Sequence, residues 1–136
     1  MPLELERAEA ASKACREHAA SIGIAISVAV VDEGGMLQSL ARMDGAPPLS
    51  AQIAEAKAVG AALWHRDGDQ LASVHQERPA FFAAVDRMVR MPMIPGLGSL
   101  VIREDGRVVG AIGVSGGKPE QDQECAHGGL EASARA

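Results

Sequence analysis

The segment Ile24-Ala-Ile-Ser-Val-Ala-Val-Val-Asp-Glu-Gly-Gly-Met-Leu-Gln-Ser-Leu-Ala-Arg-Met43 sets the architecture of the chain. From Ile24 to Val31 large branched residues alternate with Ala and Ser, which is typical of a central strand covered on both faces. Asp32 to Gly35 is turn sequence, because glycine supplies the positive φ of a tight reversal. Met36 to Met43 then reads as a second strand, so the segment predicts an antiparallel hairpin.

Helices are predicted on either side of this hairpin. Between Leu3 and Ile22, apolar and small residues recur at spacings of three and four, the pattern of a helix with one narrow apolar face, and Gly23 ends it. After a proline-rich loop, Ser50 is the expected N-cap of an alanine-rich helix from Ala51 to about Trp64.

The next part of the chain is helical and then irregular. Asp67 can cap a further helix, with a break before Pro79 and a second helical segment after it. Residues 91–98 hold two prolines and two glycines, which predicts a loop rather than an element.

A second antiparallel hairpin and a last helix complete the order. Leu100 to Arg103 and Arg107 to Val114 flank a turn at Glu104-Asp105-Gly106, and Pro119 suits the first position of a helix running to about Ala132. The order predicts one α/β (α+β) domain over residues 1–136, with helices packed on an antiparallel sheet and no βαβ crossover.

Charge and composition exclude several classes of function. The formal net charge of −5 comes without a basic stripe, which argues against binding to nucleic acid. The early apolar run from Ile22 to Val31 is far shorter than the roughly 20 residues that span a bilayer, and no signal peptide precedes it. Cys15 and Cys125 form no C-x-x-C motif, so we expect two reduced thiols in a cytoplasmic protein.

Lys57 is the most informative single residue. It shares one helical stripe with Ile53, Gly60 and Trp64, which places an ammonium among apolar and small groups. Such a lysine needs a carboxylate partner or must extend its amine to water. The candidate partners in the sequence are Asp32, Asp44 and Asp122.

Two further segments are candidates for binding an acidic ligand. Ser115-Gly116-Gly117-Lys118-Pro119 joins a strand to a helix without a good N-cap residue, which would leave backbone N–H groups free for an anion or for water. Arg42 closes the second strand beside Asp44 and could hold an acidic group, although arginines are also common on surfaces.

The four histidines lack the spacing of a zinc site. His127 lies on the last predicted helix and His18 beside the apolar face of the first, so either could ligate a haem iron. The alternative is that both are ordinary groups on helix surfaces.

Several short motifs together carry a family resemblance. They are Val28-Ala-Val-Val-Asp-Glu-Gly-Gly35, Arg42-Met-Asp-Gly-Ala46, Lys57-Ala58, and Gly106-Arg-Val-Val-Gly-Ala-Ile-Gly-Val-Ser-Gly-Gly117 with Asp122. In this order they resemble the GlcG/HbpS-type haem-degrading-domain family, which includes the C-terminal domain type of PduO corrinoid adenosyltransferases. The resemblance spans nearly the whole chain.

The resemblance implies a fold and a ligand class. The fold is a profilin-like or PAS-like antiparallel sheet of about five strands flanked by helices, assembled into symmetric dimers or larger homo-oligomers. The ligand is haem or a related tetrapyrrole. The family's Lys-Ala-x-Thr-Ala is Lys57-Ala-Val-Gly60-Ala here, and its Pro-Gly-Gly-x-Pro loop is Pro95-Gly96-Leu-Gly98-Ser99, so the lining of the presumed cleft differs.

The first functional hypothesis is a tetrapyrrole-binding protein, whether haem-degrading or accessory to a redox pathway. A cleft between the helices and one sheet end would grip the ring, and basic groups such as Arg42, Lys57 and Lys118 would meet the propionates. The residues expected to contact the ligand are Arg42, Gly96, Gly98, Ser115 and Gly116, with His18 or His127 on the iron.

The second hypothesis is a small metabolic enzyme that uses the same cleft. Lys57 and Arg42 would orient the carboxylate of an acidic metabolite, and Asp44, Asp122 or His127 would move a proton. The third hypothesis is that the protein is a purely structural or regulatory subunit.

Overall fold

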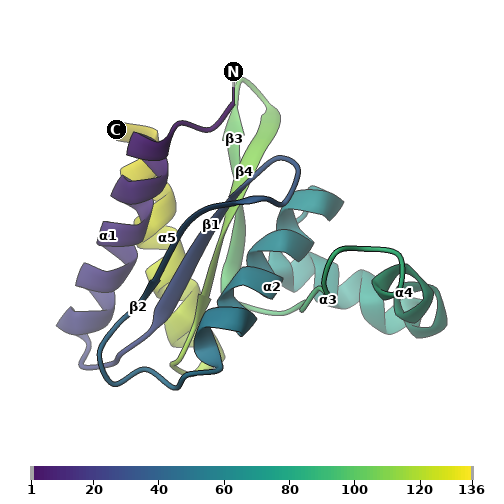
Figure 1. The fold of residues 1–136 in the computed structure, drawn as a ribbon, viewed down its shortest axis with the longest axis horizontal. Helices are drawn as coiled ribbons and strands as arrows, with labels where there is room; N and C mark the ends of the chain where they lie inside the picture. The colour runs from purple at the N-terminus through teal and green to yellow at the C-terminus, as the bar shows by residue number, and fades with distance from the viewer. Residues whose placement is uncertain (1, 136) are drawn as a thin grey trace.

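The computed structural model describes residues 2–135 of the chain (Figure 1). Two hairpins and five helices alternate in the predicted order. In sequence they are α1 (Leu5–Ser21), β1 (Ser27–Asp32), β2 (Leu37–Arg42), α2 (Ser50–Trp64), α3 (Gly68–Glu77), α4 (Pro79–Asp86), β3 (Ser99–Glu104), β4 (Arg107–Ser115) and α5 (Pro119–Arg135).

The sheet is antiparallel throughout, with strand order β2-β1-β4-β3. The strand predicted to be central, β1, lies between β2 and β4 and is buried over most of its length. The described part of the chain has four strands, so the expectation of about five is wrong. Residues 91–98 add no strand, since Pro92 and Pro95 lack the N–H that a ladder requires.

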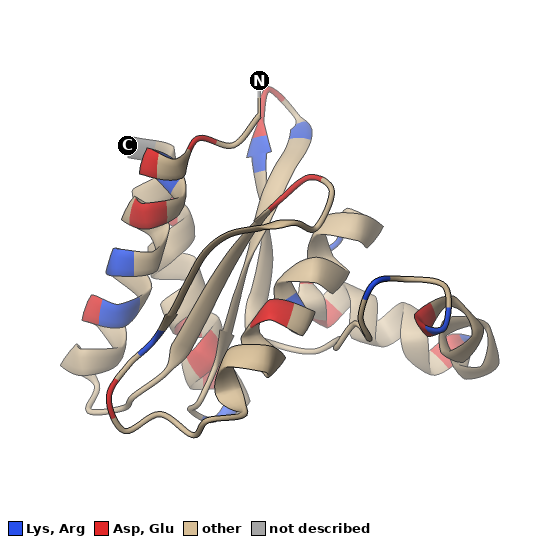
Figure 2. Cartoon of the chain, in the orientation of Figure 1, with Lys and Arg blue, Asp and Glu red and all other residues tan. Residues whose placement is uncertain are grey.

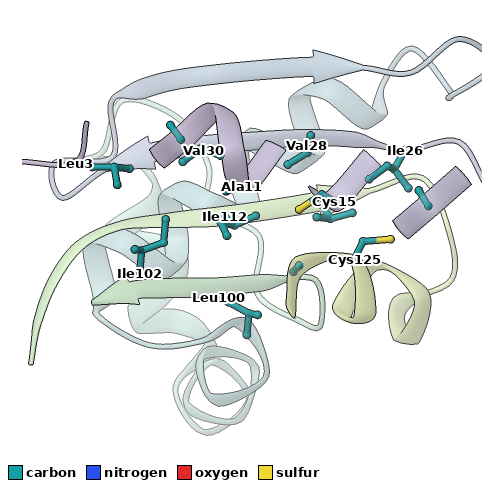
Figure 3. Close-up of a cluster of buried hydrophobic side chains, with 14 of the residues drawn as sticks. Leu3, Ala11, Cys15, Ile26, Val28, Val30, Leu100, Ile102, Ile112 and Cys125 are labelled. Atoms are coloured by element: carbon teal, nitrogen blue, oxygen red, sulfur yellow. The ribbon is translucent and has the colours of Figure 1, made fainter. Parts of the chain in front are cut away.

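Helices cover the two faces of the sheet differently (Figure 1). On one face α1 and α5 lie side by side over the larger side chains of the central strands, a core drawn in Figure 3 that includes Val28, Val30, Ile112 and Val114. On the other face α2 packs on smaller residues, among them Ala29 and Ala111.

Gly113 lets α2 approach β4 closely. A Cβ atom at this position would overlap the carbonyl oxygen of Ala54 and lie 2.7 Å from the amide nitrogen of Ala58. Both obstacles are backbone atoms of α2, which cannot rotate away. A side chain at residue 113 would therefore force the helix off the sheet.

Helices α3 and α4 form an arm that projects beyond α2 (Figure 1). The three aromatic residues of the chain meet where this arm leaves the body: the Phe82 ring centroid lies 4.8 Å from that of Trp64 and 5.5 Å from that of Phe81. At the base of the arm, the Asp67 carboxylate accepts the Val101 N–H at 2.9 Å. Asp67 does stand at the N-cap of α3, but its side chain ties the arm to β3 instead of capping the helix.

The predicted capping role of Ser50 is wrong. Ser50 is the first residue of α2, and the N-cap position is Leu49, which makes no side-chain cap. The Ser50 hydroxyl instead donates to the Pro47 carbonyl and lies 2.8 Å from the hydroxyl of Ser27. It thus fastens the start of α2 to the start of β1.

Both cysteines are free thiols in the core between α1 and α5 (Figure 3). Burial raises the pKa of Cys15 to about 12 and that of Cys125 to about 11. The thiolate, which is the reactive form, is therefore scarce at neutral pH.

We expect neither thiol to react with Ellman's reagent at pH 8 while the chain is folded, and both to react once guanidinium unfolds it. The variant Ser73→Cys, at an exposed position of α3, is the control and should label at once. Rapid stoichiometric labelling of the native wild-type chain would contradict the burial of Cys15 and Cys125.

Candidate functional site

Most of the predicted site residues gather at one end of the sheet. Strands β1 and β3 begin there and β2 and β4 end there, because Ser27 pairs with both Arg42 and Ser115. Gly98 precedes β3, and Gly116 follows β4. The sheet topology thus brings together residues that are up to 74 positions apart in the sequence (from Arg42 to Gly116).

Lys57 is buried at this end, with 9% of its surface exposed. Its Nζ donates to the carbonyl oxygen of Val114 at 2.9 Å and lies 3.4 Å from Oδ2 of Asp122. Of the two predicted alternatives, the structure shows the carboxylate partner, and of the three candidates this partner is Asp122.

This ion pair connects opposite sides of the molecule. Lys57 belongs to α2, on one face of the sheet, and Asp122 to the first turn of α5, on the other face. The two charges meet beside Val114, the next-to-last residue of β4, and next to Gly98, the residue before β3. The pair is therefore a direct link between the two helical layers.

Asp122 also organises the turn before α5. Its Oδ1 accepts the Gly117 N–H at 2.9 Å, and Oε1 of Gln121 accepts the Lys118 N–H at 2.9 Å. These two N–H groups were expected to be free for an anion and are instead occupied by side chains of the helix itself. Burial raises the pKa of Asp122, and the Gly117 N–H and the Lys57 ammonium offset part of this effect.

The glycine loop before β3 is closed over the ion pair. Gly98 has a φ of +108°, and a Cβ atom there would lie 2.9 Å from Lys57 Nζ. Its N–H donates to Oε1 of Gln123, and its carbonyl accepts the Val114 N–H. Gly96 is tied by its N–H to the Gly68 carbonyl. The loop is thus held by backbone hydrogen bonds rather than open to a ligand.

The two departures from the family pattern are packing positions. A Cβ atom at Gly60 would lie 3.1 Å from Leu71 and 3.3 Å from Met93, so a larger residue would press on α3 and on the loop. The Ser99 side chain is fully buried, and its hydroxyl has no hydrogen-bond partner among residues 2–135. Both positions therefore act through packing with their neighbours.

Three other candidates lie at the surface. Asp44 and Arg42 are exposed, and Nη1 of Arg42 donates to the Ala46 carbonyl at 3.2 Å. Asp32 closes its own turn by accepting the N–H groups of Gly34 and Met36. These residues do not join the Lys57 pair.

The two candidate histidines, His18 and His127, occupy a separate surface on α1 and α5. Nε2 of His18 lies 3.3 Å from Oε2 of Glu124, and the imidazole is about one-third exposed. His127 lies one turn beyond Glu124 and is exposed, with its Nε2 3.5 Å from Nε2 of Gln123. Within residues 2–135, no three His, Cys, Asp or Glu side chains are grouped as a set of metal ligands.

One apolar cleft was not predicted. It has a volume of about 400 Å³ and lies between α2 and the loop after α4, lined by Leu49, Gln52, Ile53, Ala56, Met91, Pro92 and Ile94. The loop composition gave no sign of it, because the cleft arises only when residues 91–94 fold back against the helix.

Sequence comparison gives one matching family and several relatives. The model of the family described as haem degrading protein HbpS-like matches residues 3–131. Protein GlcG of Escherichia coli (strain K12) is 36% identical over 115 residues, covering 83% of this chain and 81% of GlcG.

Solved structures share the fold closely. A double mutant of HbpS from Streptomyces reticuli is 30% identical with a TM-score of 0.86, covering 96% of this chain and 86% of that one. The PduOC:heme complex is 25% identical with a TM-score of 0.86, covering 97% of this chain and 95% of that one. Within residues 2–135, no helix is both long and apolar enough to cross a membrane.

Proposed function

Because the chain belongs to the HbpS-like family of haem-degrading proteins, we propose that it binds haem or a related tetrapyrrole. A structural relative is described as a complex with haem, and its fold superposes on nearly the whole of this chain. We place the protein in the cytoplasm as a symmetric homo-oligomer, and we regard haem turnover or service to a redox pathway as its role.

The observation that carries the proposal is the setting of His18. A partly exposed imidazole is the commonest protein ligand of haem iron, and here it is positioned by a carboxylate. A carboxylate bound to one ring nitrogen fixes the orientation of the ring and increases the donor strength of the other nitrogen. Because Nε2 of His18 faces Glu124, its Nδ1 would be the nitrogen that holds the iron, and His127 of the neighbouring helix α5 is the second candidate.

The surroundings of His18 fit the rest of the group. Gly128 of α5 lies beside it, and a Cβ atom there would lie 3.9 Å from the Cβ of His18. Ile22, at the C-cap of α1, is 37% exposed and offers an apolar contact for a ring. Lys118 is exposed just before α5, whose first turn lies beside the last turn of α1, so its ammonium can meet a propionate.

When bound, haem supplies an iron that exchanges electrons and binds small diatomic ligands. In this chain His18 or His127 would hold the iron, Ile22 would contact the ring and Lys118 would meet a propionate. We favour this function over acid–base chemistry at Lys57 because the charges of Lys57 and Asp122 are committed to each other, and Asp44 and His127 lie apart from them.

Titration of the purified chain with haem should give a saturable Soret band at one haem per chain or per dimer, under air and without oxygen. His18→Ala should weaken binding by about tenfold or more and shift the band, because an iron ligand is lost. His127→Ala should have a smaller effect.

The matched control is His65→Asn, which replaces an exposed histidine at the C-cap of α2. That residue has a φ of +54°, a conformation that asparagine tolerates. Absence of a Soret band in the wild-type chain would refute haem binding. Equal spectra for wild type, His18→Ala and His127→Ala would refute the assignment of the ligand.

A further inference from the structure

A polar cleft of about 340 Å³ lies between α1 and the edge strand β2. Helix α1 contributes most of its lining, and β2 closes the other side. The lining residues are Glu9, Ser12, Lys13, Arg16, Ser39 and Ala41. None of them belongs to the sheet-end cluster around Lys57 or to the surface around His18.

Basic charge exceeds acidic charge in this cleft. Lys13 and Arg16 provide two cations against the single carboxylate of Glu9. No carboxylate of residues 2–135 forms an ion pair with either cation. The cleft is thus net positive although the chain has a formal net charge of −5 and helix α1 carries both signs of charge (Figure 2).

Arg16 is held in place by one hydrogen bond. Its Nε donates to the Ser12 hydroxyl at 3.4 Å, and Ser12 is only 2% exposed although it lines the cleft. This bond uses one side of the guanidinium and leaves the two terminal nitrogens as a fork. The Ser39 hydroxyl, half-buried on the opposite wall, adds a donor from β2.

We propose that this cleft binds a small oxyanion, a carboxylate or phosphate group carried by a small molecule. A guanidinium fork matches the two oxygens of such a group, and a neighbouring ammonium adds charge without fixing geometry. Hydroxyl groups on both walls donate to the remaining oxygens. With the carboxylate of Glu9 included, the charged side chains of the cleft sum to +1.

The site is separate from the proposed haem surface. Arg16 and His18 are two residues apart on α1, which turns them about 200° from each other around the helix axis. An anion bound at Arg16 and a ring bound at His18 would therefore lie on opposite sides of α1. Either proposal can fail without the other.

The test is an NMR titration of ¹⁵N-labelled protein with inorganic phosphate and, separately, with acetate. We expect saturable shifts confined to residues 9–16 of α1 and 39–41 of β2, and the anion that binds more tightly identifies the group. Arg16→Gln should weaken binding about tenfold, since it removes a charge-assisted hydrogen-bonding group. Arg16→Lys keeps the charge but loses the two terminal guanidinium nitrogens, so its affinity for the anion should lie between those of the wild type and of Arg16→Gln.

The control is Arg103→Gln, which changes the net charge equally at an exposed position of β3. Lys13→Gln is a second test at an exposed position, should Arg16→Gln fail to fold. Shifts that do not saturate with either anion, or that spread over the whole surface, would overturn the proposal. So would an equal loss of affinity in Arg103→Gln and in the cleft variants.

Discussion

Replacing Lys57 with methionine is expected to lower the free energy of unfolding by about 3–5 kcal/mol, because it leaves the buried carboxylate of Asp122 without its positively charged partner. The loss should be largest at neutral pH. As the pH falls through the raised pKa of Asp122, the carboxyl becomes protonated and the unpaired charge disappears, so the deficit should shrink. Urea unfolding followed by far-UV circular dichroism at several pH values measures both effects.

The double variant Lys57→Met with Asp122→Asn is the matched control. Asparagine keeps an oxygen that can accept the Gly117 N–H but carries no charge. We expect it to recover more than half of the lost stability. If the double variant is as unstable as Lys57→Met alone, the cost lies in packing around the methionine and not in the unpaired charge.

Stability and ligand binding can then be separated. A double variant that folds normally and titrates with haem like the wild type would establish the pair as a structural link. A double variant that folds normally but loses a metabolic activity would return Lys57 and Asp122 to the acid–base hypothesis.

Gly113→Ala should be at least as damaging, with a loss of about 3 kcal/mol or more. The added methyl group would meet the Ala54 carbonyl and the Ala58 amide nitrogen, and both belong to the backbone of α2. Relief requires moving the whole helix away from β4, which would also pull Lys57 from its partners. Differential scanning calorimetry of the variant against wild type measures the cost.

Gly34→Ala is the control for this substitution. Its Cβ atom would lie 3.4 Å from the Asp32 carboxylate, an ordinary contact, and Gly34 has no positive φ. We expect a change of less than about 1 kcal/mol. If the midpoint of thermal unfolding of Gly113→Ala is close to that of Gly34→Ala, α2 does not pack as tightly on β4 as described.

The elements that the sequence predicted well are those determined by residues close together in the chain. The alternation of large and small side chains along residues 24–43 directly reflects the pleat of a buried strand. The strand boundaries of the predicted hairpin differ from those of the structure by one to three residues. The break before Pro79 was also correct, because proline excludes the preceding hydrogen bond by itself.

What the sequence could not resolve depended on contacts far apart in the chain. The sequence predicts a carboxylate partner for Lys57 or an amine extended to water, and choosing Asp122 over Asp32 and Asp44 required the sheet topology. The turn before α5 could have been interpreted better, since Gln121 and Asp122 stand where side chains can reach back to cap a helix start. The cleft at Arg16 appears only once β2 is placed beside α1.

The clustering of Trp64, Phe81 and Phe82 at the base of the arm has a practical consequence. Because the chain has no other Trp or Phe and no Tyr, its intrinsic fluorescence and near-ultraviolet dichroism come from this one place. Fluorescence and near-ultraviolet dichroism therefore report whether the arm is packed against Trp64. The sheet and the helices on its two faces contribute no other aromatic signal to these spectra. Melting of the core must be followed through the amide backbone or by calorimetry.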